Sequence, residues 1–459
     1  MTTTYTVKTQ AYRKKTKSIR IGLVDADLLC NGTRHPNLVL LKLAGFFKAC
    51  GYNYELITDP HTDLDDYTYV YLSQVFTFTN LPPFVDKFKT KHPRTWNQKL
   101  KMGGTGFYAI EEDSETFMKK RREDMEKLSM DPFLKTFSMA HQMPDYTIYN
   151  TYIAEQIDRK TQESIKLFIK KEKRNPNEVE IEVFKVKHRK YFKDYLDYSI
   201  GFLTRGCIRQ CPFCVNKNEK AILPYSQLAD FVNENRPYIY LWDDNFLCYK
   251  NWKELLQQLI DTGKPFQFRQ GLDERVLDEE RAKMLSKARY HGDFIFAFDR
   301  WQDKDLIERK LKIWKRYCAT KTTKFYLFCG YELTANDDNK IFNDVYYLFR
   351  RIEILMRYGC LGYVMRHADY QNHPLGNIYT QIARWCNQPQ FYKKMSFWEF
   401  IERNQTYQEE NSKSTRTCKS LITYKEFQKR FADRWLVIEP LFKMKYEQLV
   451  DPNNWMITI

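Results

Sequence analysis

Residues 201–217 read GFLTRGCIRQCPFCVNK, and the three cysteines in this stretch decide how the chain is interpreted. Cys207, Cys211 and Cys214 are separated by three and then by two residues. Thiolates are soft ligands, and several of them on one short loop select zinc or an iron–sulfur centre over harder metals. The loop therefore predicts a metal centre. Whether this centre is zinc or an iron–sulfur cluster has to be decided from the sequence around the loop.

The spacing favours an iron–sulfur cluster over zinc. A structural zinc site closes with four protein ligands, and no fourth Cys or His stands near the loop at a zinc-like spacing. A [4Fe–4S] cluster can instead take one thiolate on each of three irons, which leaves the fourth iron open. An open iron can bind a substrate or a cofactor, so this arrangement is a catalytic one.

A regular alternation of short apolar runs and amphipathic stretches begins after residue 196. The apolar runs, which predict strands, cover residues 198–203, 238–242, 265–269, 293–298, 324–329 and 361–366. The stretches with helical spacing cover residues 251–263, 278–292, 303–317 and 341–359. Strands that alternate with helices form parallel sheets through right-handed crossovers. We therefore expect an α/β fold whose core, residues 196–370, is a partial (β/α)6 TIM-like barrel.

Polar residues follow the ends of these predicted strands, which is where such a barrel places its chemistry. The segments after the strands contain, in order, the cysteine loop, Asp243 with Asp244, QGLDER (270–275), Asp299, GYELTANDD (330–338) and His367. This repetition indicates a site assembled from several loops.

The part of the chain before this core predicts a second, smaller domain. Strand-like runs cover residues 18–27, 52–58 and 67–78, a helix covers residues 36–51, and MGGTGF (102–107) predicts a loop. This order of elements indicates a small Rossmann- or flavodoxin-like α/β domain over residues 19–150. The other segments are a basic leader (1–18), a charged linker or insertion (151–195) and an aromatic and basic C-terminal extension (371–459). Exposed amphipathic helices are expected at residues 111–128 and 155–174.

Composition limits the partners and the compartment. Lys and Arg number 74 against 58 Asp and Glu, and the resulting net charge of +16 would attract a phosphate backbone. No stretch reaches the roughly 20 apolar residues that cross a bilayer, and the N-terminus shows no secretory signal. We therefore expect a cytoplasmic protein with no membrane partner, whose eleven cysteines stay reduced. Most of the eight cysteines outside the loop are expected to be small buried hydrophobes.

The loop TRGCIRQCPFC, with the aromatic Phe213 before its last cysteine, resembles the radical S-adenosylmethionine (SAM) superfamily. The run DDNF at residues 243–246 and the α/β layer before the core resemble the subgroup with an N-terminal cobalamin-binding-type domain. This resemblance implies a [4Fe–4S] cluster on Cys207, Cys211 and Cys214, with SAM bound at the open iron. It implies reductive cleavage of SAM to methionine and a 5′-deoxyadenosyl radical, which removes a hydrogen atom from the substrate. An electron donor such as flavodoxin or ferredoxin is the implied partner.

The resemblance also carries cofactor contacts over to single positions. Phe213 belongs to the cofactor-binding loop, and Asp243 or Asp244 would meet the SAM ammonium, although a Gly-Gly-Glu run is commoner at that place. The other implied SAM contacts are Gln270, Asp273 and Arg275 for the ribose and carboxylate and Gly330 for the adenine. Two alternatives stay open: DDNF as an ordinary turn that caps a helix, and Arg275 as a surface ion-pair partner.

Cobalamin is the less favoured cofactor. Domains that hold it through a histidine show Asp-x-His-x-x-Gly, and DADLLCNGTRHPN (25–37) contains no such run. We therefore expect the cobalamin-binding type of fold without cobalamin. Cobalamin retention would make methyl transfer the leading reaction.

Three functions are compatible with these features. The first is a radical SAM enzyme acting on a nucleic acid or nucleotide, which the positive charge and the aromatic and basic run at residues 385–407 favour. The second is the same chemistry, or methylation, on a peptide or small metabolite. The third is a non-catalytic iron–sulfur binding protein, which gives no reason for the polar residues after the strands.

Overall fold

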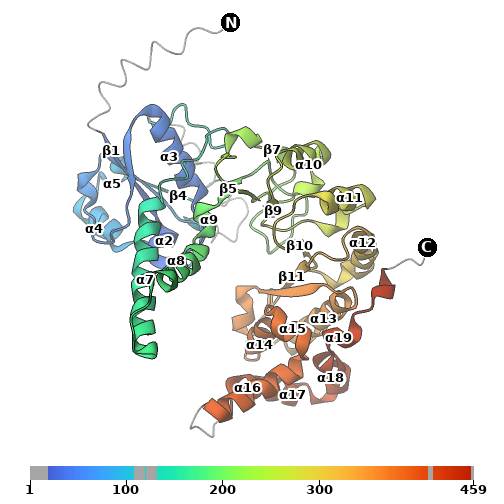
Figure 1. Ribbon diagram of the computed structural model, residues 1–459. Coiled ribbons are helices and arrows are strands. Elements are labelled where there is room, and N and C mark those ends of the chain that lie inside the picture. Colours follow the sequence, from blue (N-terminus) through green and yellow to red (C-terminus); the bar gives the residue numbers. More distant parts are fainter. Residues whose placement is uncertain are drawn as a thin grey trace. The chain divides into compact units, whose positions relative to one another are not determined.

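The computed structural model describes residues 19–107, 119, 123, 131, 133–411 and 417–455. The chain divides into two compact units (Figure 1). The first comprises Met1–Leu203 with Tyr225–Tyr240, and the second comprises Thr204–Pro224 with Leu241–Ile459. The basic leader lies outside the described residues, as does nearly all of the helix expected at residues 111–128. The domain boundaries expected from the sequence stay a prediction.

A four-stranded parallel sheet forms the centre of the first unit. Its order is β2 (Asn53–Leu56), β1 (Arg20–Asp25), β3 (Tyr69–Ser73) and β4 (Leu100–Gly103). Successive residues of a strand face opposite sides of the sheet. Leu23 accordingly packs in one apolar layer with α3 (Leu38–Cys50), and Val24 packs in another with α4 (Pro83–Lys91). Helices cover both faces, which confirms the α/β class for this unit.

Helix α3 shows how local sequence sets its ends. The Asn37 side chain caps the first turn by accepting a hydrogen bond from Leu40 N, and Gly51 ends the helix in the left-handed conformation at φ +73°. The predicted end at Gly51 is confirmed. The remaining short elements of this unit are α2 (Ala26–Asn31), η2 (Leu64–Asp66), α5 (Trp96–Lys99), η3 (Thr105–Phe107), α9 (Lys193–Leu196) and η4 (Leu228–Asp230).

Two expectations for this unit are wrong in part. The run at residues 67–78, expected to be a strand, forms one only over Tyr69–Ser73. The run at residues 102–107 was expected to be a loop, but Met102 and Gly103 complete β4. Leu100 at the start of β4 is 1% exposed and pairs with Val70 of β3. Burial of this apolar side chain at the sheet edge outweighs the low strand preference of the glycines that follow.

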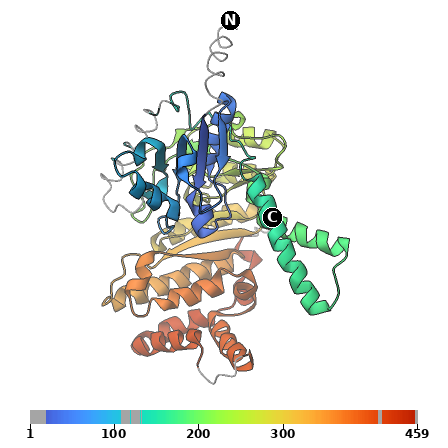
Figure 2. The ribbon, with the colours of Figure 1, turned by 90° about the vertical axis from the view of Figure 1, so that its left-hand side faces the viewer.

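Two long helices, α7 (Asn150–Glu172) and α8 (Glu178–Tyr191), form an antiparallel hairpin (Figure 2). Phe168 packs edge-on against Phe184, and Ser164 Oγ lies 2.8 Å from His188 Nε2. These contacts hold the two helices together, and most of their side chains are exposed. The exposed amphipathic helix expected over residues 155–174 is confirmed. Strands β5 (Tyr198–Gly201) and β8 (Tyr238–Leu241) follow, and the chain passes into the second unit at the end of β8.

The second unit contains most of the predicted alternation. Its strands are β9 (Phe266–Phe268), β10 (Phe294–Ala297), β11 (Thr323–Cys329) and β12 (Leu361–Arg366), and the helices between and beside them are α10 (Trp252–Asp261), α11 (Glu279–Lys287), α12 (Lys304–Tyr317) and α13 (Asp338–Arg357). Strands β10, β11 and β12 form a parallel sheet in that order. Leu272, after β9, makes a parallel bridge to Phe296 of β10. The strands and helices occur where the sequence predicted them, and their closure into a partial barrel stays a prediction.

The carboxyl ends of β10 and β11 are tied together by a buried arginine. Arg351 of α13 is 2% exposed and donates to the carbonyl oxygens of Phe298 (2.7 Å), Asp299 (2.9 Å) and Phe328 (3.0 Å). A guanidinium has enough donors to satisfy three carbonyls at once. The strand ends that lead into the polar loops are therefore fixed in place.

Helices dominate the C-terminal part of the second unit. They are α14 (Asn377–Cys386), α15 (Pro389–Lys394), α16 (Phe397–Asn411), α17 (Lys419–Arg430), α18 (Trp435–Lys443) and α19 (Tyr446–Leu449). Trp385, Tyr392 and Phe397 are fully buried, and Trp385 stacks on Phe349 of α13. These aromatic side chains of the run at residues 385–407 form the core and are not exposed for stacking on bases.

Short elements complete the second unit. They are β6 (Thr204–Arg205), β7 (Leu223–Pro224), η5 (Phe246–Cys248), η6 (Glu274–Val276), η7 (Trp301–Asp303), η8 (Ala368–Asn372), η9 (Ala432–Arg434) and η10 (Pro452–Asn454). Among the helices of the described ranges, none combines the length and the apolar character that a membrane span requires.

Candidate functional site

A small antiparallel ladder closes the base of the cysteine loop. Strand β6 pairs with β7, with Thr204 opposite Pro224 and Arg205 opposite Leu223. Gly206 begins the loop at φ +101°, and a Cβ there would lie 2.2 Å from the carbonyl oxygen of Ala221. Only glycine fits this conformation and this close approach.

Nitrogen donors surround two of the three sulfur atoms. Arg209 N donates to Cys207 Sγ at 3.4 Å, and Asn216 N donates to Cys214 Sγ at 3.4 Å. Asn245 Nδ2 also donates to Cys207 Sγ, again at 3.4 Å. Such N–H···S bonds stabilise thiolates and tune iron–sulfur centres.

The three thiols are close to one another without forming a closed ligand group. Burial raises the pKa of Cys211 and of Cys214, and in each case neighbouring thiols of the loop raise that pKa further. Within the part of the chain that the structure describes, no three His, Cys, Asp or Glu side chains converge as a metal-binding group. The donor set fits an iron–sulfur cluster in its chemistry.

Two carboxylates after β8 hold the flanks of the cysteine loop. Asp243 Oδ1 accepts hydrogen bonds from Thr204 N (2.6 Å) and Thr204 Oγ1 (2.7 Å). Asp244 accepts from Gly206 N (2.9 Å) on one oxygen and from Asn216 Nδ2 (2.8 Å) on the other. Both side chains therefore have partners in the protein, and a contact of either with the SAM ammonium stays a prediction.

Asn245 is a site residue that the sequence analysis did not single out. It is 4% exposed, and its Nδ2 donates to Cys207 Sγ and to Asp273 Oδ2 (3.1 Å). Among the described residues, no donor reaches its buried Oδ1. The available signal was its position in DDNF, directly after the two predicted aspartates.

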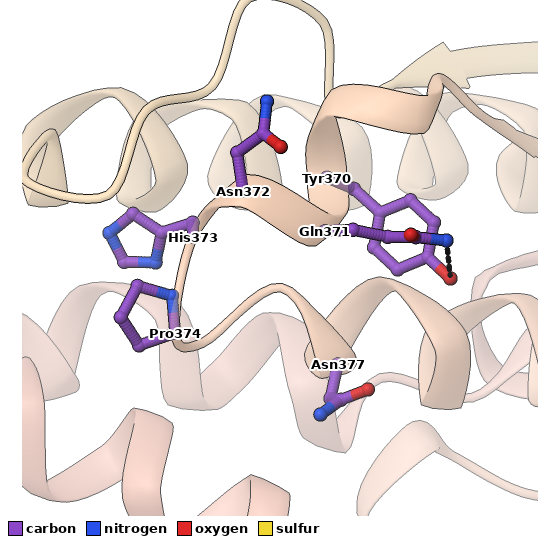
Figure 3. A pocket seen from close by; sticks show the side chains of 6 residues that line it. All are labelled: Tyr370, Gln371, Asn372, His373, Pro374 and Asn377. Atoms are coloured by element: carbon purple, nitrogen blue, oxygen red, sulfur yellow. Dashed lines mark hydrogen bonds between the residues drawn. The ribbon is translucent and has the colours of Figure 1, made fainter.

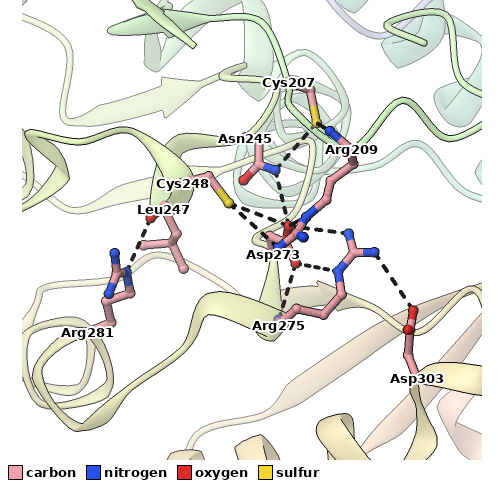
Figure 4. Close-up of polar contacts among 9 residues, drawn as sticks. All are labelled: Cys207, Arg209, Asn245, Leu247, Cys248, Asp273, Arg275, Arg281 and Asp303. Atoms are coloured by element: carbon pink, nitrogen blue, oxygen red, sulfur yellow. Dashed lines mark hydrogen bonds and ion pairs between the residues drawn. The ribbon is translucent and has the colours of Figure 1, made fainter. Parts of the chain in front are cut away.

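Asp273 gathers polar groups from several loops (Figure 4). Arg209 Nε lies 2.6 Å from its Oδ2, and Arg275 Nε lies 2.8 Å from its Oδ1. Burial by itself would raise the pKa of Asp273, but Arg275 and Arg209 outweigh it and hold that pKa below its ordinary value. Arg275 also lies 3.8 Å from Asp303 Oδ2. Arg275 is therefore an ion-pair partner, but of a buried carboxylate and not at the surface as the alternative had it, and its predicted contact with SAM stays a prediction.

Cys248 belongs to the same network and is not a simple buried hydrophobe. Its Sγ donates to Asp273 Oδ2 at 3.6 Å, and burial followed by the charge of Asp273 raises the pKa of Cys248 to about 11. It therefore stays a neutral thiol beside the cysteine loop. Cys30 and Cys50 are exposed, so the expectation that most of these cysteines are buried does not extend to them. The cysteines that are buried as expected are Cys318, Cys329, Cys360, Cys386 and Cys418.

Phe213 anchors the cysteine loop on an aromatic cluster. Its ring stacks on that of Phe328, at the end of β11, with centroids 3.7 Å apart and an interplanar angle of 22°. Tyr331 lies edge-on to Phe213 at 6.1 Å and to His367 at 5.0 Å. The end of β11 and the segment after it therefore contact the cysteine loop through Phe328 and Tyr331, and His367 after β12 packs on these two rings.

Two other predicted SAM contacts, Gly330 and Gln270, lie outside the contacts described so far. Gly330 has φ +77°, and a Cβ there would lie 2.8 Å from Tyr370 Cβ, so the loop after β11 needs glycine at this position. Its role toward the adenine stays a prediction. Gln270 is exposed, which sets it apart from the buried Asp273, and its contact with SAM stays a prediction.

A separate cavity of about 480 Å³ lies in the loop after β12 (Figure 3). It is lined by Tyr370, Gln371, Asn372, His373, Pro374 and Asn377. His373 Nδ1 accepts from Leu375 N at 3.1 Å, and its Nε2 lies 3.3 Å from Asp338 Oδ1. This lining includes none of the predicted cofactor-binding residues, so we place the candidate site at the cysteine loop.

Comparison with known proteins gives only matches to solved structures, and the one described here has low similarity. No protein-family model matches the chain, and no curated protein sequence matches it. Six chains of solved structures match, among them Streptococcus suis SuiB bound to S-adenosylmethionine, with a TM-score of 0.27 and 11% sequence identity. That match covers 61% of this chain and 66% of the SuiB chain, slightly less than two thirds of the latter. Similarity at this level carries no argument about function, which has to rest on the residues of the loop.

Proposed function

We propose that the protein is a radical SAM enzyme whose Cys207, Cys211 and Cys214 hold a [4Fe–4S] cluster. The observation that carries the proposal is the loop between β6 and β7, which presents three thiols within eight residues and directs N–H donors at two of the sulfurs. Soft thiolates with N–H donors suit an iron–sulfur cluster. When bound with one iron open, such a cluster supplies the one-electron cleavage of SAM to methionine and a 5′-deoxyadenosyl radical.

Residues beside the loop would bind and orient SAM. Asn245 Oδ1 is a buried acceptor that suits the SAM ammonium, next to the predicted contacts Asp243 and Asp244. Arg275 is held by Asp273 and presents a guanidinium that suits the SAM carboxylate. Asp273 would then act by positioning Arg275 and Arg209, since both of its oxygens receive guanidinium groups.

The substrate class is proposed on charge alone. A net charge of +16 favours a nucleic acid or nucleotide, because a basic surface attracts phosphates. The buried Trp385, Tyr392 and Phe397 give this idea no support from base stacking. Retention of RNA or DNA that weakens as salt is raised would favour a nucleic acid, and absence of retention would favour a peptide or small metabolite.

Anaerobic reconstitution tests the proposal directly. The protein should bind about four iron per chain and show a broad iron–sulfur absorption band. After reduction it should slowly convert SAM to 5′-deoxyadenosine and methionine. Zinc without iron after reconstitution would overturn the proposal, and S-adenosylhomocysteine together with retained cobalamin would move the reaction to methyl transfer.

A further inference from the structure

The carboxylate of Asp244 reaches both flanks of the cysteine loop. Its Oδ2 accepts from the N–H of Gly206, which directly precedes Cys207, at 2.9 Å. Its Oδ1 accepts from Asn216 Nδ2, two residues after Cys214, at 2.8 Å. Its side chain is 12% exposed, so water competes little for these bonds. One side chain thus joins the two ends of the segment that contains all three thiols.

Both partners of Asp244 are coupled to a sulfur atom. Gly206 is the neighbour of Cys207, and its φ of +101° beside the carbonyl oxygen of Ala221 leaves no room for any residue with a Cβ. Asn216 donates its backbone N–H to Cys214 Sγ and its side-chain amide to Asp244. The Asp244 carboxylate therefore controls the spacing of the backbone beside the first and the last cysteine.

Asp243 holds Thr204 at the start of the loop base, but among the contacts described for the base no other carboxylate reaches both flanks. Strands β6 and β7 contain two residues each, and so short a ladder contributes little independent stability. Closing the loop between them costs conformational entropy. Hydrogen bonds to an ionised acceptor are the stronger kind, and Arg205 Nε, 3.2 Å from Asp244 Oδ2, adds an ion pair.

We infer that Asp244 is a positioning residue that closes the cysteine loop and sets the span across which the cluster is held. The cluster part of this inference rests on the proposed function, whereas the loop closure is a property of the metal-free chain. It gives Asp244 a role other than the contact with the SAM ammonium.

The side-chain pair of Asp244 and Asn216 allows a reversal experiment. Asp244→Asn keeps the shape but replaces one accepting oxygen by an NH2 group, which cannot accept from Gly206 or Asn216. Asn216→Asp sets two carboxylates against each other. The double variant exchanges donor and acceptor across the contact and still leaves an oxygen for Gly206 N. Asp278→Asn, at the cap of α11 in the same unit, is the matched control.

Amide hydrogen exchange on the metal-free protein measures the closure. Each single variant should speed exchange in the segment around Gly206 by about tenfold, as expected for the loss of a charge-assisted hydrogen bond. The exchange rate of the double variant should return to within about threefold of the wild-type rate, and the control Asp278→Asn should exchange at the wild-type rate. An unchanged rate in Asp244→Asn, or a double variant as fast as the single variants, would overturn the inference.

Loss of the cluster to a chelator tests the second part. In reconstituted protein, Asp244→Asn and Asn216→Asp should lose iron about tenfold faster than the wild type, and the double variant should recover. If wild-type protein binds no iron but the exchange pattern holds, the proposed function fails and the loop closure stands. If iron binds and is lost equally fast from all variants, the positioning role toward the cluster fails and the proposed function stands.

Discussion

Arg209 Nε lies 2.6 Å from Asp273 Oδ2, although the two residues are 64 positions apart in the chain. Arg209 stands inside the cysteine motif, and Asp273 stands after β9, where a contact with SAM is predicted. The same carboxylate binds Arg275 and accepts from Asn245 and Cys248. Arg209 of the proposed cluster loop and the proposed SAM contacts Arg275 and Asn245 are therefore parts of one polar network.

Asp273→Asn should weaken both parts of this network. The substitution releases Arg209 and Arg275 from their shared carboxylate, and charge-assisted bonds of this kind are worth roughly 1.5–3 kcal/mol. We expect SAM affinity, measured by calorimetry on cluster-loaded protein, to fall by about 10- to 150-fold. Asp303→Asn, which removes only the 3.8 Å contact of Arg275, should stay close to the wild type. Wild-type affinity in Asp273→Asn would contradict the network.

Replacing any one of Cys207, Cys211 and Cys214 by Ala should abolish the cluster, because each would supply one of the three protein ligands. Cys248→Ala should keep it, since the Cys248 thiol is neutral and hydrogen-bonded to Asp273. Iron content and visible absorption after anaerobic reconstitution distinguish the two cases. Loss of iron in Cys248→Ala, in a protein with an unchanged apparent Tm, would mean that four thiols hold the metal.

Asn245→Leu should lower SAM affinity, because it removes a buried oxygen that suits the ammonium group. Loss of a hydrogen bond from a charged donor should lower the affinity for SAM by about 10- to 150-fold, measured by calorimetry on cluster-loaded protein. Asn245→Asp, which keeps an acceptor at this position, should bind SAM more tightly than Asn245→Leu. Equal affinity in the two variants would count against Asn245 as the acceptor.

Asp243→Asn and Asp244→Asn test the contacts that the sequence predicts. If one of these carboxylates contacts the SAM ammonium, replacing it should lower the affinity for SAM by about 10- to 150-fold. Replacing the other carboxylate should lower that affinity less. The affinity has to be normalised to the iron content, because Asp244 also holds the cysteine loop. Unchanged affinity in both variants would remove the predicted ammonium contact from these two positions.

Asp25 at the end of β1 should make the stability of the protein depend on pH. Burial raises the pKa of Asp25 to about 7, against hydrogen bonds from Tyr149 and Leu28 that lower it. The folded state therefore keeps a proton that the unfolded state has already lost, so stability falls as pH rises from about 4 to 7. Asp25→Asn removes this dependence and still offers an oxygen to Leu28 N.

The apparent Tm of metal-free protein at pH 5 and pH 8 checks this prediction. The apparent Tm of Asp25→Asn should exceed that of the wild type by more at pH 8 than at pH 5. The reason is that the buried Asp25 of the wild type destabilises the folded state more at the higher pH. Asp63→Asn, at an exposed cap in the same unit, is the control and should show no such difference. An equal gain at both pH values would show that the Asp25 carboxyl does not titrate in this range.

The sequence by itself determined the cysteine loop and the order of the secondary structure. Spacing is a local property, so Cys207, Cys211 and Cys214 predict a ligand set before any fold is known. Apolar periodicity is local in the same way, which is why β9 to β12 and the helices between them occur where they were predicted. The expectation failed at Met102 and Gly103, because the strand there is stabilised by the neighbouring β3 and not by its own residues.

Only the tertiary structure decided which polar groups meet at the site. Nothing local to DDNF shows that Asp244 bonds to both Gly206 and Asn216, or that no donor among the described residues reaches the buried Oδ1 of Asn245. Nothing local to QGLDER shows that Asp273 holds an arginine of the cysteine motif. A buried carboxylate is stable only where donors or cations meet it, and those partners come from segments far away in the chain. Their choice depends on which loops the strand ends bring together, and that is decided when the sheets form.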